Sequence, residues 1–230
     1  MLEWIGLTIV KRYLSTSTSD KVEDVHSDPA YFQKGIDLIL RNPSGSITTI
    51  DLKVDSYYGS DPNRKIRGLC NPDSGYILLE TISQLQFDRE RHVDNSGTLR
   101  THNRPDVPGW FYTSTADQVY YYFLAILNTT AELRPLYAEY LELVRAQRPT
   151  LGLDEKLLRS LKIDRDLLIT YPLDKARAWY ETASRDAFAG YAPAANPTYI
   201  TISVRAHRDR FVSGLPAESH GPIFNTLRAR

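Results

Sequence analysis

Two neighbouring segments in the first quarter of the chain constrain its fold most strongly, because both alternate apolar and polar residues with a period of two. Residues 35–40 and 47–55 are rich in Ile, Leu, Val and Thr, and the intervening Asn42-Pro43-Ser44-Gly45 has the composition of a turn. Successive side chains of a strand point to opposite faces, so these segments predict a β-hairpin with one apolar face and one exposed polar face. The apolar face comprises Ile36, Leu38, Leu40, Ile50, Leu52 and Val54, and the polar face includes Asp37, Thr49, Asp51, Lys53 and Asp55.

The position of the turn predicts which residues of the hairpin face each other. If the turn centres on Ser44, antiparallel partners have residue numbers that sum to 88, which pairs Asp37 with Asp51 and Gly35 with Lys53. Two carboxylates at a cross-strand distance of ~5 Å repel each other, and a divalent cation would compensate for this repulsion. Magnesium suits such a site, because it binds one or two carboxylates together with waters and substrate phosphate oxygens. Lys53 would add a cation on the same face, and Gly35 would leave room for a substrate backbone.

The remaining segments predict an α/β fold with a mixed central β-sheet flanked by helices. We expect one domain over residues 1–230, with a core of about residues 1–130 and a helical addition and tail over 131–230. Helical spacing predicts helices over residues 2–14, 115–127, 133–147, 153–161 and 174–187, and strand-like patterns predict strands over residues 22–25, 76–84 and 198–204. Residues 87–108 have the composition of a long exposed loop, and the pattern of residues 216–230 predicts no particular element.

Composition excludes several other classes of protein. The longest apolar run, near residues 120–127, is too short for the ~20 residues of a membrane span, and the first residues do not form a secretion signal. The single cysteine, Cys70, allows no internal disulfide and no cysteine-based zinc cluster, so we expect a cytoplasmic location. With 28 basic and 28 acidic residues the formal net charge is zero, so any binding to nucleic acid must rest on local basic segments.

The hairpin resembles the active-site hairpin of the PD-(D/E)XK nuclease superfamily, which has the restriction-endonuclease-like fold. The resemblance is carried by Gly35-Ile36-Asp37-Leu38-Ile39-Leu40, a gap of 13 residues after Asp37, and then Asp51-Leu52-Lys53. It implies that Asp37 and Asp51 bind Mg²⁺ or Mn²⁺ and that Lys53 is the catalytic cation. It also implies that DNA is the substrate and that the chain works as a homodimer where two strands are cut. The proline of the family name is absent, because Ile36 precedes Asp37.

The resemblance suggests further contributors to the site, which the sequence leaves as alternatives. A third acidic ligand could come from Glu3, Glu23 or Glu80, and Gln118 with Tyr122 matches a Gln and Tyr spacing found on a helix in some branches of the family. Aromatic and basic residues in loop-like segments could form a rim that stacks on bases and contacts phosphates, namely Tyr57, Tyr58, Arg64, Lys65, Arg67, Trp110, Phe111 and Tyr112.

Two other functions remain open at the level of sequence. The chain could be a non-catalytic nucleic-acid-binding or assembly protein that retains the nuclease-like fold. It could also be a structural scaffold in which the polar face of the hairpin is only a solvated surface, with Lys53 forming a salt bridge.

Overall fold

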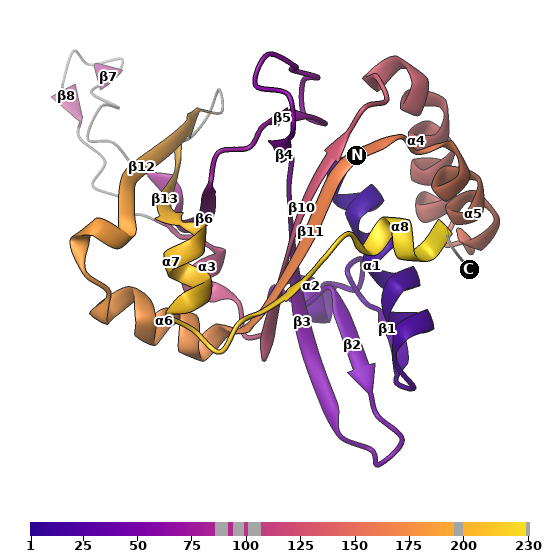
Figure 1. The fold of residues 1–230 in the computed structure, drawn as a ribbon, viewed down its shortest axis with the longest axis horizontal. Coiled ribbons are helices and arrows are strands. Elements are labelled where there is room, and N and C mark those ends of the chain that lie inside the picture. Colours follow the sequence, from indigo (N-terminus) through magenta and orange to yellow (C-terminus); the bar gives the residue numbers. More distant parts are fainter. Residues whose placement is uncertain (86–91, 94–98, 101–106, 196–199, 229–230) are drawn as a thin grey trace. The chain divides into compact units, whose positions relative to one another are not determined.

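The computed structural model describes residues 1–85, 92–93, 99–100, 107–195 and 200–228 (Figure 1). The chain divides into two compact units, which we call unit 1 and unit 2. Unit 1 consists of Met1–Gly75, Ala116–Leu173 and Pro216–Arg230, and unit 2 consists of Tyr76–Thr115 and Asp174–Leu215. The expected organisation was a core of residues 1–130 with a helical addition. The two units are divided differently, because each of them combines segments that are distant in the sequence.

Unit 1 is built on a mixed six-stranded sheet with the strand order β1-β2-β3-β10-β11-β14. Strand β10 runs parallel to β3, and the other neighbouring pairs are antiparallel. This sheet and its helices confirm the expected mixed α/β architecture. The strands are β1 (Lys21–Asp24), β2 (Leu38–Arg41), β3 (Ile47–Asp55), β10 (Gln118–Ile126), β11 (Ile163–Pro172) and β14 (Glu218–His220), and β4 (Tyr57–Gly59) and β5 (Asn71–Pro72) form a separate parallel pair.

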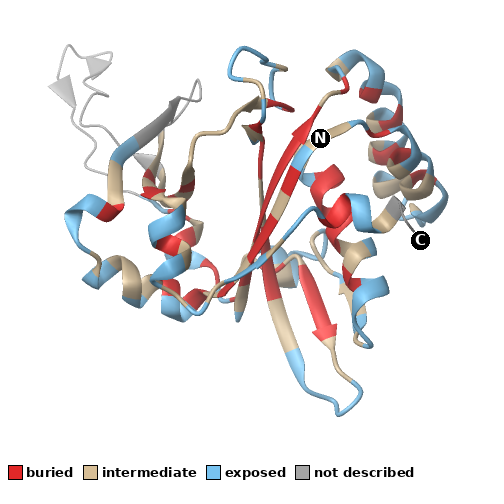
Figure 2. Ribbon diagram, in the orientation of Figure 1, coloured by how far each residue is buried: buried red, intermediate tan, exposed pale blue. Residues whose placement is uncertain are grey.

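Helices α1, α4, α5 and α8 of unit 1 cover one face of this sheet and build the main hydrophobic core with it (Figures 1 and 2), whereas α2 packs through Tyr31 in a smaller cluster with Ile36, Ile39 and Ala116. Helix α4 begins with a capping box, in which the Thr129 side chain accepts the N–H of Glu132 and the Glu132 carboxylate accepts the N–H of Thr129. From the sheet, the core takes the apolar face of the hairpin, including Leu38, Ile50 and Leu52. The helices are α1 (Leu2–Ser17), α2 (Pro29–Phe32), α4 (Thr130–Arg145), α5 (Leu151–Ser160) and α8 (Ile223–Arg228).

Unit 2 contains a second sheet, with the strand order β12-β13-β6-β9. Its helix α6 is tied to α3, because the guanidinium of Arg177 donates hydrogen bonds to the carbonyls of Phe111 and Ser114, each 2.7 Å long. The elements are β6 (Tyr76–Leu85), β7 (His92–Val93), β8 (Leu99–Arg100), β9 (Val107–Pro108), α3 (Trp110–Thr113), α6 (Leu173–Thr182), the 3₁₀ helix η1 (Arg185–Ala187), β12 (Phe188–Ala195), β13 (Ile200–His207) and α7 (Arg208–Ser213). Strands β7 and β8 pair with each other.

The helix predicted over residues 115–127 is wrong, since this segment contains strand β10. The strand lies between β3 and β11 in the sheet, and all of its residues from Tyr121 to Ile126 are buried (Figure 2). A strand covered on both faces is apolar throughout and therefore lacks the alternation that identifies a half-exposed strand. Its β-branched and aromatic residues were the signal that favoured a strand.

Most other predicted elements are confirmed, with shifted boundaries. The patterns over residues 2–14, 22–25, 76–84 and 198–204 correspond to α1, β1, β6 and β13, and the three later helices correspond to α4, α5 and α6 with η1. Strands β11 and β12 were not predicted, and the C-terminal segment contains β14 and α8. Most of the loop predicted over residues 87–108 lies outside the described residues. In the part of the chain that the structure describes, none of the helices has the length and apolar character needed to cross a membrane.

A buried carboxylate attaches the C-terminal helix to the sheet of unit 1. Asp166 on β11 is 5% exposed and accepts hydrogen bonds from the Tyr122 hydroxyl and from the backbone N–H of Phe224, both 3.0 Å long. Burial raises the pKa of Asp166, and the hydrogen bonds from Phe224 and Tyr122 act against this rise. The interaction joins β10, β11 and the start of α8 in one core.

We predict that Asp166→Ala destabilises the protein by about 2–4 kcal/mol, because it leaves a buried hydroxyl and a buried N–H without an acceptor. The free energy of unfolding, measured by urea titration, tests this prediction. Asp174→Ala is the matched control, because the Asp174 side chain is 71% exposed and its only ion pair with a described residue is the one to Lys175; its effect should stay below about 0.5 kcal/mol. Equal effects of the two substitutions would contradict an anchoring role for Asp166.

Candidate metal centre on the β2–β3 hairpin

The hairpin has the register that the sequence predicts. The Asn42 side chain shapes its turn by accepting hydrogen bonds from the hydroxyl of Ser44 (2.7 Å) and the N–H of Ser46 (2.8 Å), and Gly45 adopts a positive φ of 90°. The paired residues are Leu38 with Ile50, Ile39 with Thr49, Leu40 with Thr48 and Arg41 with Ile47, so every pair sums to 88. The position that follows the last pair holds Asp37 on one segment and Asp51 on the other.

The first strand of the hairpin begins later than predicted. Gly35 has a left-handed φ of 64° and donates its N–H to the carbonyl of Phe32, so the chain is still turning out of α2 at this point. Strand β2 starts only at Leu38, and the predicted pairing of Lys53 with Gly35 is therefore wrong. The cause is local, because a left-handed glycine cannot continue a ladder of extended residues.

Asp37 is nevertheless held against β3. Its N–H donates to the carbonyl of Ile50 (2.8 Å), and its carboxylate oxygen Oδ2 accepts the N–H of Leu52 (2.7 Å). On the other side, the Asp37 carbonyl accepts the N–H of Val25 (2.9 Å), which ties it to the end of β1. These contacts from two neighbouring segments position the Asp37 carboxylate beside β3.

Asp51 is fully buried, which corrects the expectation that the polar face of the hairpin is exposed. Its side chain is 0% exposed, and its Oδ1 atom lies 2.6 Å from Nζ of Lys53, whose side chain is 26% exposed. Despite this short ion pair, neither Oδ1 nor Oδ2 of Asp51 accepts a hydrogen bond of ordinary geometry from the described residues. Asp55 lies on the same face and differs, because its two oxygens accept from the N–H of Tyr57 and the hydroxyl of Tyr121.

The pKa of Asp37 indicates the electrostatic cost of this arrangement. Burial is the largest cause of its rise to about 6, and the negative charge of Asp51 raises it further. The Leu52 N–H, Lys53 and His26 act in the opposite direction without cancelling the rise. Two partly desolvated carboxylates of like charge therefore share one end of the hairpin, where a cation would stabilise both ionised forms.

A tyrosine that sequence analysis missed lies in the same row of the sheet. Val119 on β10 pairs with Asp51 on one side and with Tyr171 on the other, so the three side chains lie on one face. Tyr171 is 0% exposed, and burial together with the charge of Asp51 raises the pKa of its hydroxyl well above the ordinary value. The only available signal was the apolar character of β11, which the sequence alone did not assign as a strand.

Within unit 1, the structure does not bring the other suggested acidic residues to this site. Glu3 is exposed on α1, and Glu23 forms ion pairs with Lys21 (2.8 Å) and Arg41 (3.0 Å). Glu80 belongs to unit 2.

The Gln118 and Tyr122 pair lies on β10 instead of a helix. These residues pair with Ile50 and Val54, so they lie on the sheet face opposite Asp51, and the Tyr122 hydroxyl is bonded to Asp166. They are therefore not part of the candidate centre.

The suggested rim is divided between the two units. Tyr57, Arg64, Lys65 and Arg67 are exposed in unit 1, whereas Tyr58 packs beneath the guanidinium of Arg165 at 4.2 Å from the ring centre. Trp110, Phe111 and Tyr112 form helix α3 of unit 2, where Phe111 is fully buried. Of the suggested rim, only Tyr57, Arg64, Lys65 and Arg67 therefore have the expected exposed position in unit 1.

Comparisons with known proteins add no family assignment. No protein-family model, no curated protein and no solved structure matches the chain. Within the described residues, no group of three or more His, Cys, Asp and Glu side chains is arranged to hold a metal ion. The candidate centre thus offers the two carboxylates of Asp37 and Asp51 as its side-chain ligands.

We predict that Asp37→Asn raises the thermal stability of the metal-free protein. The pKa of Asp37 is about 6 in the folded state and near 4 when unfolded, so folding becomes less favourable as the pH rises from about 4 to above 6. The asparagine removes this penalty, which is about 3 kcal/mol, and retains an acceptor for the Leu52 N–H. Melting temperatures in EDTA should show a larger gain from the substitution at pH 8 than at pH 5. An unchanged or lower melting temperature at pH 8 would argue against the paired carboxylates.

Proposed function

We propose that this protein is a magnesium-dependent nuclease that hydrolyses DNA phosphodiester bonds at Asp37, Asp51 and Lys53. The observation that supports this most strongly is Asp51, a fully buried carboxylate with a lysine ammonium at 2.6 Å and no well-formed hydrogen bond from the described residues. Burying such a charge is costly unless it is paired or coordinates a metal. The mixed sheet with α1 packed behind the hairpin is compatible with a restriction-endonuclease-like fold.

The residues present fit a magnesium or manganese ion. Asp37 and Asp51 provide two carboxylates, and the backbone carbonyl of Leu52 between Asp51 and Lys53 is a further oxygen candidate. Mg²⁺ commonly binds one or two carboxylates and completes its coordination with water and phosphate oxygens. When bound, the ion would neutralise charge on the phosphate and lower the pKa of a water molecule.

Lys53 would supply the protein's own electrostatic contribution to the reaction. Its ammonium lies beside Asp51 while a quarter of its side chain remains exposed, so it can contact both the buried carboxylates and an incoming phosphate. Hydrolysis adds water to phosphorus and breaks one ester P–O bond, with negative charge growing on the phosphate oxygens. A hydrogen bond from the Lys53 ammonium to one of these oxygens would stabilise this charge.

Binding to DNA would rest on local charge, because the net charge of the chain is zero. The exposed side chains of Arg64, Lys65 and Arg67 lie in the loop between β4 and β5 of unit 1, where they could contact phosphates. Since each chain carries one candidate centre, cleavage of both strands of a duplex would be served by a homodimer.

We predict that Asp51→Ala and Lys53→Ala each abolish Mg²⁺-dependent nicking of supercoiled plasmid DNA while the protein stays folded. Loss of a metal ligand or of the cation should reduce the rate by at least about 100-fold. Lys156→Ala is a matched control, because Asp154-Glu155-Lys156 is another acid-x-lysine triplet but lies on helix α5, where Lys156 pairs with Glu139. Circular dichroism checks that each variant is folded.

The alternative is a non-catalytic protein that binds or assembles on nucleic acid. A wild-type protein that binds DNA but cuts neither single-stranded nor duplex DNA with Mg²⁺ or Mn²⁺ would favour this alternative and overturn the nuclease proposal.

We also predict that Tyr171→Phe weakens Mn²⁺ binding by about tenfold, which is the size of effect expected when a group supporting a metal ligand is removed. The substitution removes only the hydroxyl near Asp51 and keeps the ring in the core. Calorimetric titration of Mn²⁺ measures the effect, and Tyr57→Phe, at an exposed tyrosine, is the control. Unchanged Mn²⁺ affinity in Tyr171→Phe would show that its hydroxyl does not support the centre.

A further inference from the structure

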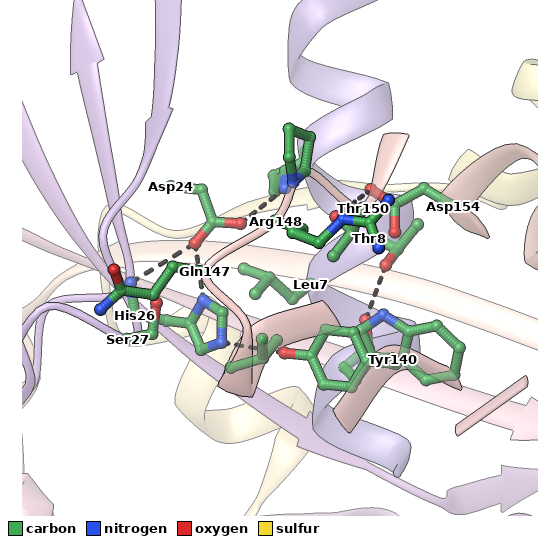
Figure 3. Close-up of a pocket in the computed structure, with 14 residues that line it drawn as sticks. Leu7, Thr8, Asp24, His26, Ser27, Tyr140, Gln147, Arg148, Thr150 and Asp154 are labelled. Atoms are coloured by element: carbon green, nitrogen blue, oxygen red, sulfur yellow. Dashed lines mark hydrogen bonds and ion pairs between the residues drawn. The ribbon is translucent and has the colours of Figure 1, made fainter. Parts of the chain in front are cut away.

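Unit 1 contains a pocket of about 510 Å³ among its helices, separate from the candidate metal centre (Figure 3). Its walls come from α1, the residues that follow β1, helix α4, the connection to α5, and the first turn of α5. Trp4, Leu7, Val144 and Pro149 provide apolar lining, and acidic and basic groups line the rest from four of these segments. Nothing in the proposed nuclease reaction uses this pocket.

A three-residue ionic cluster forms one side of the pocket. The Asp24 carboxylate contacts Nζ of Lys11 at 2.5 Å and Nδ1 of His26 at 2.6 Å (Figure 3). Burial raises the pKa of Asp24, but the hydrogen bond from His26 and the charge of Lys11 outweigh this and hold it at about 2. Asp24 is therefore ionised, and two cationic groups compensate its single charge.

The protonation of His26 determines whether the Tyr140 hydroxyl can donate a hydrogen bond to a ligand. The hydrogen bond to Asp24 raises the pKa of His26, which favours the doubly protonated imidazolium. Nε2 of His26 lies 3.1 Å from the Tyr140 hydroxyl oxygen. When His26 is doubly protonated, both ring nitrogens donate, so the Tyr140 oxygen accepts this bond and its own proton is free to donate to another acceptor.

The rim of the pocket adds another basic group, Arg148. Arg148 follows the left-handed residue Gln147 (φ 52°), is exposed, and forms no ion pair with any described residue. The remaining charged group is Asp154, a half-buried carboxylate that accepts a hydrogen bond from Thr150 and whose pKa burial raises. With His26 protonated, three cationic groups face two acidic ones, and the charge balance of the pocket is then positive.

We infer that this pocket binds the phosphate group of a small phosphorylated molecule. Lys11, Tyr140 and Arg148 supply donors from three different segments, and a phosphate group has enough oxygens to accept from all of them. The volume exceeds that of phosphate alone, so the apolar lining around Trp4 would contact an organic portion. Carboxylates offer only two oxygens and satisfy fewer of these donors.

Titration of the metal-free 230-residue chain with inorganic phosphate in EDTA, at constant ionic strength, tests this inference. Amide chemical shifts in two-dimensional NMR should change saturably around residues 147–153, and sulfate should compete. Arg148→Gln should weaken binding by about tenfold, as expected for loss of a charge-assisted hydrogen bond, and Tyr140→Phe by about threefold to tenfold.

Two matched controls distinguish phosphate binding in the pocket from nonspecific attraction to surface charge. Arg145→Gln removes an exposed arginine from the last turn of α4, the helix that carries Tyr140. Tyr137→Phe removes a hydroxyl from another ring of α4 that packs on Trp4. Neither residue lines the pocket, so both variants should bind phosphate as the wild type does. Asp51→Asn should also bind phosphate as the wild type does. The phosphate result is therefore independent of whether the nuclease proposal holds. Linear, unsaturable shifts, or equal weakening in Arg145→Gln and Arg148→Gln, would overturn the inference.

Discussion

Apolar packing between α1 and one face of the six-stranded sheet determines the register of the hairpin, and the candidate centre depends on that register. Leu38, Ile50 and Leu52 enter the core on this face, so a shift of one residue would expose them and bury their polar neighbours. The same alternation directs Asp51 and Lys53 to the opposite face. The hydrophobic effect therefore positions the charged groups, although it acts on other residues.

The polar face of β3 carries two carboxylates, Asp51 and Asp55, whose environments differ. Asp55 is buried but its oxygens accept hydrogen bonds from Tyr57 and Tyr121, so its charge is stabilised within the protein. Asp51 is buried and forms an ion pair with the Lys53 ammonium, but its oxygens accept no hydrogen bond of ordinary geometry from the described residues, and Asp37 beside it has a raised pKa. This contrast between residues on one strand is the electrostatic basis for assigning a cation to Asp37 and Asp51 and a structural role to Asp55.

Unit 1 carries a second concentration of charge on its helical side, and the two regions meet near the end of β1. Val25 is bonded to the Asp37 carbonyl, while the residues on either side of Val25 form the ionic cluster of the pocket. In addition, the positive charge of His26 lowers the pKa of Asp37. The short segment from Asp24 to His26 is thus a structural connection between the phosphate pocket and the metal centre that we propose.

The sequence by itself determined the hairpin, its register and the grouping of Asp37, Asp51 and Lys53, because turn chemistry and period-two alternation act between residues close in the chain. Only the tertiary structure decided that residues 118–126 form a strand, that Tyr171 joins the row of Asp51, and that Asp51 is buried. A central strand is apolar on both faces and resembles a helix in sequence, so its identity depends on the neighbours that cover it. Burial is likewise set by segments far away in the chain, and no local pattern contains that information.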